Sequence, residues 1–148
     1  MSDLQGKTAL VTGSVQGIGL AVAKALGSAG ARIAVHGLAS PAEREAAVES
    51  VLQAGAPEAR FFEADMRDPD AIERMMAEIA DWGGADILVN NAGIQKTASL
   101  ADADAETWDA IIAVNLSGAF HTMRFALPAM AERGYGRVVN IASVHGLV

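Results

Sequence analysis

The sequence contains no cysteine in its 148 residues, which excludes disulfide bonds, thiolate chemistry and zinc bound by cysteine. Cations are also scarce: 11 lysines and arginines stand against 18 aspartates and glutamates, and the formal net charge is −7. No basic stripe is present that could neutralise the phosphates of a nucleic acid. We therefore expect no nucleic-acid partner.

Signals for export or for a membrane are missing as well. Residues 1–7 have no secretory pattern, and no continuous apolar run approaches the length of a membrane span. About half of the residues (51%) are hydrophobic and no segment is low in complexity, which argues against disorder and predicts a real core. The expectation is a cytoplasmic protein without a membrane partner, with one domain over residues 1–148.

Short apolar runs alternate with longer amphipathic stretches, a pattern typical of βα units around a parallel sheet. We place strands at 8–11, 31–36, 60–64, 86–90 and 136–141, and helices at 20–26, 41–54, 69–82 and 104–126. The predicted fold class is therefore α/β, a parallel sheet with helices on both faces.

A glycine-rich loop at 12–19 links the first predicted strand to the first predicted helix. Glycines there can adopt backbone angles closed to other residues, let a ligand approach the main chain and let the helix pack tightly on the sheet. Free N–H groups at the helix start attract a phosphate. The loop predicts a seat for the pyrophosphate of a dinucleotide, although a tight turn that serves packing alone has the same spacing. The candidate cofactor-binding residues of this loop are Gly13, Ser14, Gln16, Gly17, Ile18 and Gly19.

Polar residues and glycines also follow the other predicted strands. In an open parallel sheet the ligand lies outside the carboxyl ends of the strands. Together with the glycine loop, these segments gather at one edge of an apolar sheet and predict a site there. They are Gly37-Leu38, Asp65-Met66, Asn91-Ala92-Gly93-Ile94-Gln95 and Ser143-Val144-His145.

The end of the second strand indicates which dinucleotide to expect. An acidic residue there usually holds the adenosine ribose, and a basic residue holds a 2′-phosphate. The sequence has His36, Gly37 and Leu38 at this position and Gln16 within the glycine loop, so neither charge is present. A 2′-phosphate would lack its charged partner, while Leu38 could pack against the ribose or adenine. We expect NAD rather than NADP, and we interpret His36 as a tolerated polar residue at a strand end.

The long helix predicted at 104–126 carries an amide on its apolar side, because Asn115 falls on the stripe that its apolar residues form. A buried amide must find hydrogen-bond partners, so Asn115 is expected to bond something specific. The apolar residues with helical spacing are Trp108, Ile111, Ile112, Leu116, Ala119, Phe120 and Met123.

Taken together, these segments resemble the classical short-chain dehydrogenase/reductase family over the whole chain. The matching motifs are the loop 12–19, Asn90-Asn91-Ala92-Gly93, Asn115 on the long helix and Ser143 after the fifth strand. The resemblance implies a Rossmann-type doubly wound sheet and an oxidoreductase with a dinucleotide cofactor. It implies that Asp65 bonds the adenine amino group. The candidate cofactor-binding residues outside the glycine loop are Leu38, Asp65, Met66, Asn91, Ala92, Gly93 and Val114.

Three segments, at 91–95, 108–112 and 140–148, resemble the bacterial D-3-hydroxybutyrate dehydrogenases in particular. The resemblance implies oxidation of this small hydroxy acid to acetoacetate, with NAD as the cofactor. It also implies a homotetramer in which the long helix pairs with a helix of a neighbouring subunit.

The same resemblance assigns roles to four residues. Gln95 and His145 would bind the substrate carboxylate, Ser143 would hold the reacting oxygen, and Asn115 would hold a water in the proton relay. An amide and an imidazole supply the hydrogen-bond donors that a small anion needs. On the residues alone, Gln95 could still be a solvated loop residue, His145 a structural histidine and Ser143 an ordinary turn serine.

The acid–base pair of the family has no counterpart in this sequence. The family places a tyrosine, with a lysine four residues later, beyond this serine, whereas Tyr135 is the only tyrosine and precedes the fifth strand. Lys7, Lys24 and Lys96 all lie upstream. We expect the sequence to be the amino-terminal part of a longer dehydrogenase, incomplete after its fifth strand and inactive by itself. Two alternatives stay open: a reductase of 3-oxoacyl chains, which usually favours NADPH, and a catalytically dead nucleotide-binding module.

Overall fold

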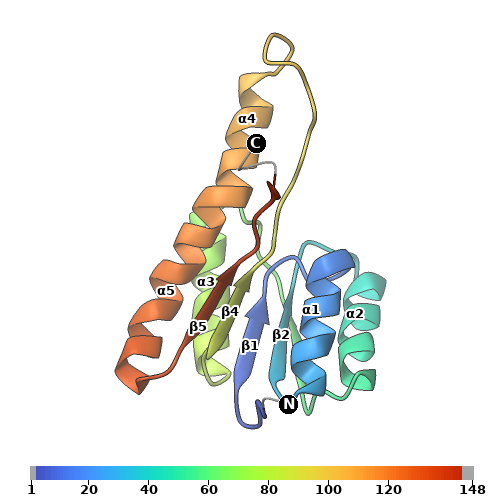
Figure 1. Cartoon of the computed structure of the whole chain (residues 1–148), viewed down its shortest axis with the longest axis vertical. Coiled ribbons are helices and arrows are strands. Elements are labelled where there is room, and N and C mark those ends of the chain that lie inside the picture. Colours follow the sequence, from blue (N-terminus) through green and yellow to red (C-terminus); the bar gives the residue numbers. More distant parts are fainter. Residues whose placement is uncertain (1–2, 145–148) are drawn as a thin grey trace.

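The computed structural model describes residues 3–144, and in that part of the chain five strands form one parallel sheet (Figure 1). The sheet order is β3–β2–β1–β4–β5. The chain moves outward from β1 to β3 and then crosses back to place β4 on the other side of β1. This reversal confirms the predicted doubly wound, Rossmann-type α/β fold. The strands are β1 (Thr8–Val11), β2 (Arg32–His36), β3 (Ala59–Phe62), β4 (Ile87–Asn90) and β5 (Arg137–Asn140).

Helices cover both faces of the sheet and enclose two hydrophobic cores (Figure 1). Val11 and Ile33 belong to the core beneath α1 and α2, whereas Leu10, Phe62 and Leu88 belong to the core beneath α3 and α5. Successive strand side chains point to opposite faces, so one strand serves both cores. Each fully buried Leu, Ile or Phe side chain stabilises the fold by roughly 1.5–3 kcal/mol. The helices are α1 (Gly17–Ser28), α2 (Pro41–Gln53), α3 (Pro69–Asp81), α4 (Ala105–Ile112) and α5 (Gly118–Arg133).

Side-chain caps fix the starts of α2 and α3 where the sequence predicts them. The Glu43 carboxylate accepts the N–H of Ser40 at 2.8 Å, and the Ser40 hydroxyl accepts the N–H of Glu43, which completes a capping box. Asp68 caps α3 by accepting the N–H of Asp70 at 3.0 Å. These caps explain why the predicted starts of the two helices agree with the structure.

The long helix differs from its prediction in two ways. It continues to Arg133, where Gly134 takes the left-handed conformation (φ +66°) that ends many helices. It is also interrupted by a π-helical turn, η1 (Ala113–Ser117), in which the N–H of Gly118 bonds to the carbonyl of Ala113, five residues earlier. Hydrophobic spacing carries no signal for such a turn, so the sequence predicts one uninterrupted helix.

The first part of this helix extends beyond the sheet. Figure 1 shows α4, and the loop that leads into it, above the carboxyl ends of the strands. Trp108, Leu116 and Phe120 of the predicted apolar stripe are therefore more than half exposed. Asn115 lies in η1 and is exposed as well, which corrects the expectation that it is buried.

Among the described residues, the helical stretch Ala105–Arg133 is long and apolar enough to be compared with a membrane span, although charged residues interrupt it and it is no continuous apolar run. By length and composition its 29 residues could cross a membrane, with a mean hydropathy of 1.2 in an 18-residue window. A helix that packs on a sheet passes the same test, and α5 does so through Thr122, Ala126 and Met130, which are buried. Length and composition alone therefore assign no membrane role.

Candidate functional site

A cavity of about 510 Å³ lies at the carboxyl ends of the strands, where the sequence predicts a site. Its walls come from the loops after β1, β2, β3 and β4 and from η1. The strand order reverses between β1 and β4, and open α/β sheets bind their ligands at such a point. Of the predicted cofactor residues, the cavity is lined by Gly13, Gln16, Leu38, Asp65, Met66, Asn91, Ala92, Gly93 and Val114. Its other walls are Val15, His36, Gly37, Ala64, Arg67 and Ile94.

The glycines of the loop serve different purposes. A Cβ atom on Gly13 would lie 2.9 Å from the Cα of Ala92, and one on Gly19 would overlap the carbonyl oxygen of Gly13, so packing explains these two glycines. Gly17 takes the left-handed conformation (φ +58°), and a Cβ there would meet no atom of residues 3–144 within 4 Å. The left-handed backbone therefore explains this glycine, and the space beside it is open.

The start of α1 is open to an anion. Gln16 occupies its N-cap position, but no side chain of the described residues caps this helix, and its first turn holds no acidic residue. By contrast, α2, α3 and α4 begin at the capping side chains Ser40, Asp68 and Asp104. Uncapped N–H groups and the positive end of the helix dipole favour a phosphate. Gly17, Ile18 and Gly19, which do not line the cavity, supply the first N–H groups of this helix.

Thr12 joins the glycine loop to the loop after β4. Its hydroxyl oxygen accepts the N–H of Asn91 at 3.0 Å and the N–H of Ala92 at 2.9 Å. The Asn91 amide donates in return to the carbonyl oxygens of Thr12 (3.1 Å) and Gly13 (3.0 Å). The two loops are therefore held as one unit. No separate role was predicted for Thr12, although a hydroxyl residue at a strand end is a signal for such a link.

His36 is a structural part of the site, which corrects its interpretation as a merely tolerated polar residue. Its side chain is buried, its Nδ1 accepts the N–H of Gly13 at 3.0 Å, and its Nε2 lies 3.0 Å from the carbonyl oxygen of Ala64. Burial lowers the pKa of His36, and the hydrogen bond to Ala64 opposes this effect in part. The predicted cofactor residue Ser14 is also fully buried, and its hydroxyl accepts the N–H of His36 at 3.0 Å.

Arg67 is a cation at the cavity that was not predicted from the sequence. Its main-chain N–H, Nε and Nη2 all donate to the carboxylate of Asp65, at distances between 2.6 and 3.1 Å. These hydrogen bonds hold the pKa of the Asp65 carboxyl below its usual range. The adenine amino group that Asp65 is predicted to bind would therefore share this carboxylate with Arg67. Asp65-x-Arg67 has the spacing of a local ion pair, which is the signal that could have revealed it.

The amide of Asn115 has specific partners, as the sequence predicts. Its Oδ1 accepts the N–H of Ile94 at 2.8 Å, and its Nδ2 donates to the carbonyl oxygen of Ile94 at 2.9 Å. The neighbouring Val114 is buried against the cavity. The π-turn η1 and the loop after β4 therefore meet at one wall of the site.

The predicted substrate residues lie at the same edge but outside the cavity walls. Gln95 is exposed in the loop after β4, and Ser143 is exposed three residues after the end of β5. Asn90 and Asn140 are paired in the register of β4 and β5, so both following loops leave the sheet side by side. His145 lies outside the described residues.

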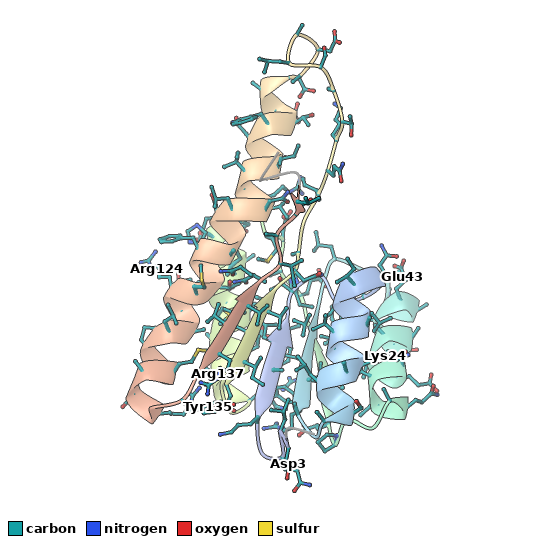
Figure 2. The ribbon with its side chains drawn as sticks, in the orientation of Figure 1. Asp3, Lys24, Glu43, Arg124, Tyr135 and Arg137 are labelled. Atoms are coloured by element: carbon teal, nitrogen blue, oxygen red, sulfur yellow. The ribbon has the colours of Figure 1, made fainter. Side chains whose placement is uncertain are left out.

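Tyr135 lies at the opposite edge of the sheet (Figure 2). It follows the end of α5 and precedes β5, and the Lys7 ammonium lies 3.9 Å from the centroid of its ring. The guanidinium of Arg137 lies 4.8 Å from the same centroid. The one tyrosine of the sequence therefore contacts cations at the amino ends of the strands, far from the cavity.

Comparison with known proteins supports the same assignment of the fold and shows the family. Residues 7–148 match the family described as short chain dehydrogenase. The chain is 53% identical over 147 residues to a D-beta-hydroxybutyrate dehydrogenase of Cupriavidus necator, and 50% identical over 143 residues to one of Rhizobium meliloti. These matches cover 98% and 96% of this chain but 56% and 55% of the relatives, so the chain spans about half the length of the curated relatives it matches.

A solved structure gives the same result for the fold. A 3-oxoacyl (acyl-carrier-protein) reductase from Agrobacterium tumefaciens, crystallised with NADP bound, is similar to this chain with a TM-score of 0.90. The two are 35% identical, and the match covers 97% of this chain and 55% of the reductase.

Proposed function

The chain belongs to the short-chain dehydrogenase family, and on that premise we propose that the whole protein is an NAD-dependent D-3-hydroxybutyrate dehydrogenase. The observation that carries the proposal is the cavity at the reversal of strand order, with the uncapped start of α1 beside it. The identity of 50–53% to two proteins named for this activity supports the choice of substrate. Residues 1–148 would supply the dinucleotide site of this enzyme.

The residues present suit a dinucleotide. Gly17 leaves room beside the main chain, and the N–H groups at the start of α1 offer donors to a pyrophosphate. Leu38 and Asp65 would hold the adenosine end, and Asn91, Ala92 and Gly93 would hold the part nearer β4. When bound, the nicotinamide supplies the acceptor for a hydride.

The charges around the cavity support NAD over NADP. Gln16 and Leu38 offer no cation to a 2′-phosphate, as the sequence analysis noted. Arg67 is a cation in the cavity wall, but its Nε and Nη2 already donate hydrogen bonds to the carboxylate of Asp65. A 2′-phosphate would have to compete with that carboxylate for the guanidinium.

Four residues would act on the substrate. Ser143 orients the hydroxyl group that loses its proton, Gln95 and His145 hold the carboxylate, and Asn115 places a water in the proton relay. The side chain of Asn115 is hydrogen-bonded to the main chain of Ile94. The main chain of Asn115 in the π-turn, rather than its side chain, would therefore hold the water. Tyr135 lies at the wrong edge of the sheet to accept the hydroxyl proton. The proton acceptor would therefore come from outside residues 1–148, and these residues alone would be inactive.

The whole protein would be a cytoplasmic homotetramer, and the exposed apolar side of the long helix supports a contact between subunits. Trp108, Leu116, Phe120 and Leu127 are all exposed on this one helical stretch. Apolar surface of this kind marks a contact with another protein. The helix would pair with the same helix of a neighbouring subunit.

A reductase of 3-oxoacyl thioesters is the second candidate, because the similar structure from Agrobacterium tumefaciens carries that name and binds NADP. Substrate and cofactor assays on the whole protein, whose intact mass is measured first, separate the two. We expect NADH to form from NAD⁺ with D-3-hydroxybutyrate, and much less with its L enantiomer or with a 3-hydroxyacyl thioester. Turnover of the thioester with NADP⁺, and none of D-3-hydroxybutyrate, would establish the second candidate instead. Nucleotide binding without turnover of any alcohol would identify a binding module.

A further inference from the structure

We propose that His36 is a positioning residue for the dinucleotide loop and acts only in its neutral form, so that protonation of this imidazole weakens nucleotide binding. The inference rests on the proposed function in one respect, which is that a dinucleotide occupies the cavity beside the glycine loop.

The hydrogen bonds of the imidazole select one tautomer. The main-chain N–H of Gly13 can only donate, so Nδ1 of His36, which lies 3.0 Å away, must be an acceptor without a proton. The carbonyl oxygen of Ala64 can only accept, so Nε2, which also lies 3.0 Å away, must carry the proton. Both ring nitrogens are therefore used, and only the neutral ring with its proton on Nε2 satisfies both partners.

The same residue also holds the loop through its main chain. The N–H of His36 donates to the Ser14 hydroxyl at 3.0 Å, and the N–H of Ser14 donates to the carbonyl oxygen of His36 at 2.8 Å. His36 therefore joins the glycine loop after β1 to the end of β2, and its ring extends the link to Ala64 after β3. The loops after β1 and β3 and the end of β2 therefore meet at this one residue.

A second proton on the ring would break the arrangement. Nδ1 would become a donor and would face the donor N–H of Gly13, which would lose its acceptor. On the side of β4, Gly13 is already held by the Asn91 amide, which donates to its carbonyl oxygen at 3.0 Å. The loop would have to move away from β2, and the start of α1 would move with it.

The surroundings offer the imidazolium no stabilising anion. The loop 12–16 and β1 carry no titratable side chain, and α1 carries Lys24 alone. Arg60 lies on β3, and Asp68 and Asp70 lie at the start of α3. Glu63 pairs with Arg44 of α2, Asp65 pairs with Arg67, and Glu43 bonds Ser40. Within residues 3–144, no carboxylate bonds His36, and burial accordingly lowers its pKa.

The tautomer is tested directly by the nitrogen chemical shifts of the histidine rings in the ¹⁵N-labelled 148-residue chain at neutral pH. The sequence has three histidines, so the variant His36→Asn identifies the signal of His36. We expect a neutral ring with the proton on Nε2. A proton on Nδ1, or a charged ring at neutral pH, would overturn the inference.

The effect on binding is tested by calorimetric titration with NAD⁺ from about pH 7.5 down to the lowest pH at which the chain stays folded, because burial places the pKa of His36 below its ordinary value. For the natural chain we expect the affinity to fall by about tenfold per pH unit below the pKa of His36, because one proton must leave before binding. The Asn side chain in His36→Asn can still accept the N–H of Gly13 but cannot titrate, so the affinity of this variant for NAD⁺ should not change with pH. If His36→Asn does not fold, His36→Gln replaces it. Circular dichroism confirms folding at each pH. Equal pH profiles for the natural chain and the variant would overturn this inference alone, whereas no binding of NAD⁺ at any pH would overturn the proposed function with it.

Discussion

The carboxamide of Asn115 and the main chain of Ile94 exchange two hydrogen bonds, of 2.8 and 2.9 Å. Asn115 lies in the π-turn of the long helix, and Ile94 lies in the loop after β4, so the pair ties a helix to a loop at one wall of the cavity. Gln95, the predicted ligand of the substrate carboxylate, directly follows Ile94. Its position therefore depends on an amide that lies 20 residues further along the chain.

Replacing Asn115 tests this link. Asn115→Ala removes both hydrogen bonds from an exposed pair, and we expect the free energy of unfolding to fall by about 1 kcal/mol. The loop after β4 should become more mobile, and the affinity for NAD⁺ should fall. Urea unfolding and calorimetry measure the two effects. Ser117→Ala, in the same π-turn, is the control, and equal stability and affinity for both variants would show that the link has no such role.

The glycines of the loop should respond differently to the same added methyl group. Gly19→Ala places a Cβ atom on the carbonyl oxygen of Gly13, so we expect a loss of about 2 kcal/mol or more in urea unfolding. Gly17→Ala has room, and should lose only about 1 kcal/mol from its left-handed backbone while binding NAD⁺ much more weakly. Gly6→Ala carries the same backbone strain (φ +73°), also in open space, but Gly6 precedes β1 and lies away from the start of α1. If Gly6→Ala weakened NAD⁺ binding as much as Gly17→Ala, backbone strain rather than ligand space would explain the result.

The cofactor preference should depend on Leu38. This side chain lines the cavity, is 60% exposed and follows the end of β2, where a 2′-phosphate is usually recognised. Leu38→Arg supplies a cation that is not already paired, and we expect the affinity for NADP⁺ to rise about tenfold with little change for NAD⁺. Leu38→Gln controls for the loss of the apolar side chain. An equal gain for both variants would mean that charge does not select the cofactor.

Stability should depend on pH through His36. Its pKa in the folded chain lies below the ordinary value of 6.5 because of burial, so the unfolded chain binds the proton more readily. The contribution to stability is therefore fully present above pH 6.5 and is lost as the pH falls toward the folded-state pKa. The slope can reach about 1.4 kcal/mol per pH unit. Urea unfolding at several pH values should show this slope in the natural chain and a shallower one in His36→Asn; parallel curves would contradict the assignment.

Much of the fold follows from the alternation of apolar and amphipathic segments. The strand 8–11 is predicted to the residue, and Ser40 and Asp68 locate the starts of α2 and α3 because their side chains complete the caps. The sequence does not predict that Trp108 and Phe120 are exposed. Hydrophobic spacing identifies the apolar side of a helix but not the surface that covers it.

The site was predicted less completely than the fold, for a physical reason. Sequence position places residues at strand ends, and the cavity does contain Asp65 and Asn91. Sequence position does not reveal the direction in which a side chain points. His36 turns inward to Gly13, and no spacing in the sequence indicates that hydrogen bond, whereas the pair of Asp65 with Arg67 follows from their local spacing.

The most direct test of the account is calorimetric titration of the folded 148-residue chain with NAD⁺ and with NADP⁺ under the same conditions. The account predicts saturable binding of NAD⁺ at one site, weaker binding of NADP⁺, and loss of NAD⁺ affinity in Gly17→Ala. Absence of saturable NAD⁺ binding by the folded chain, or tighter binding of NADP⁺, would contradict it.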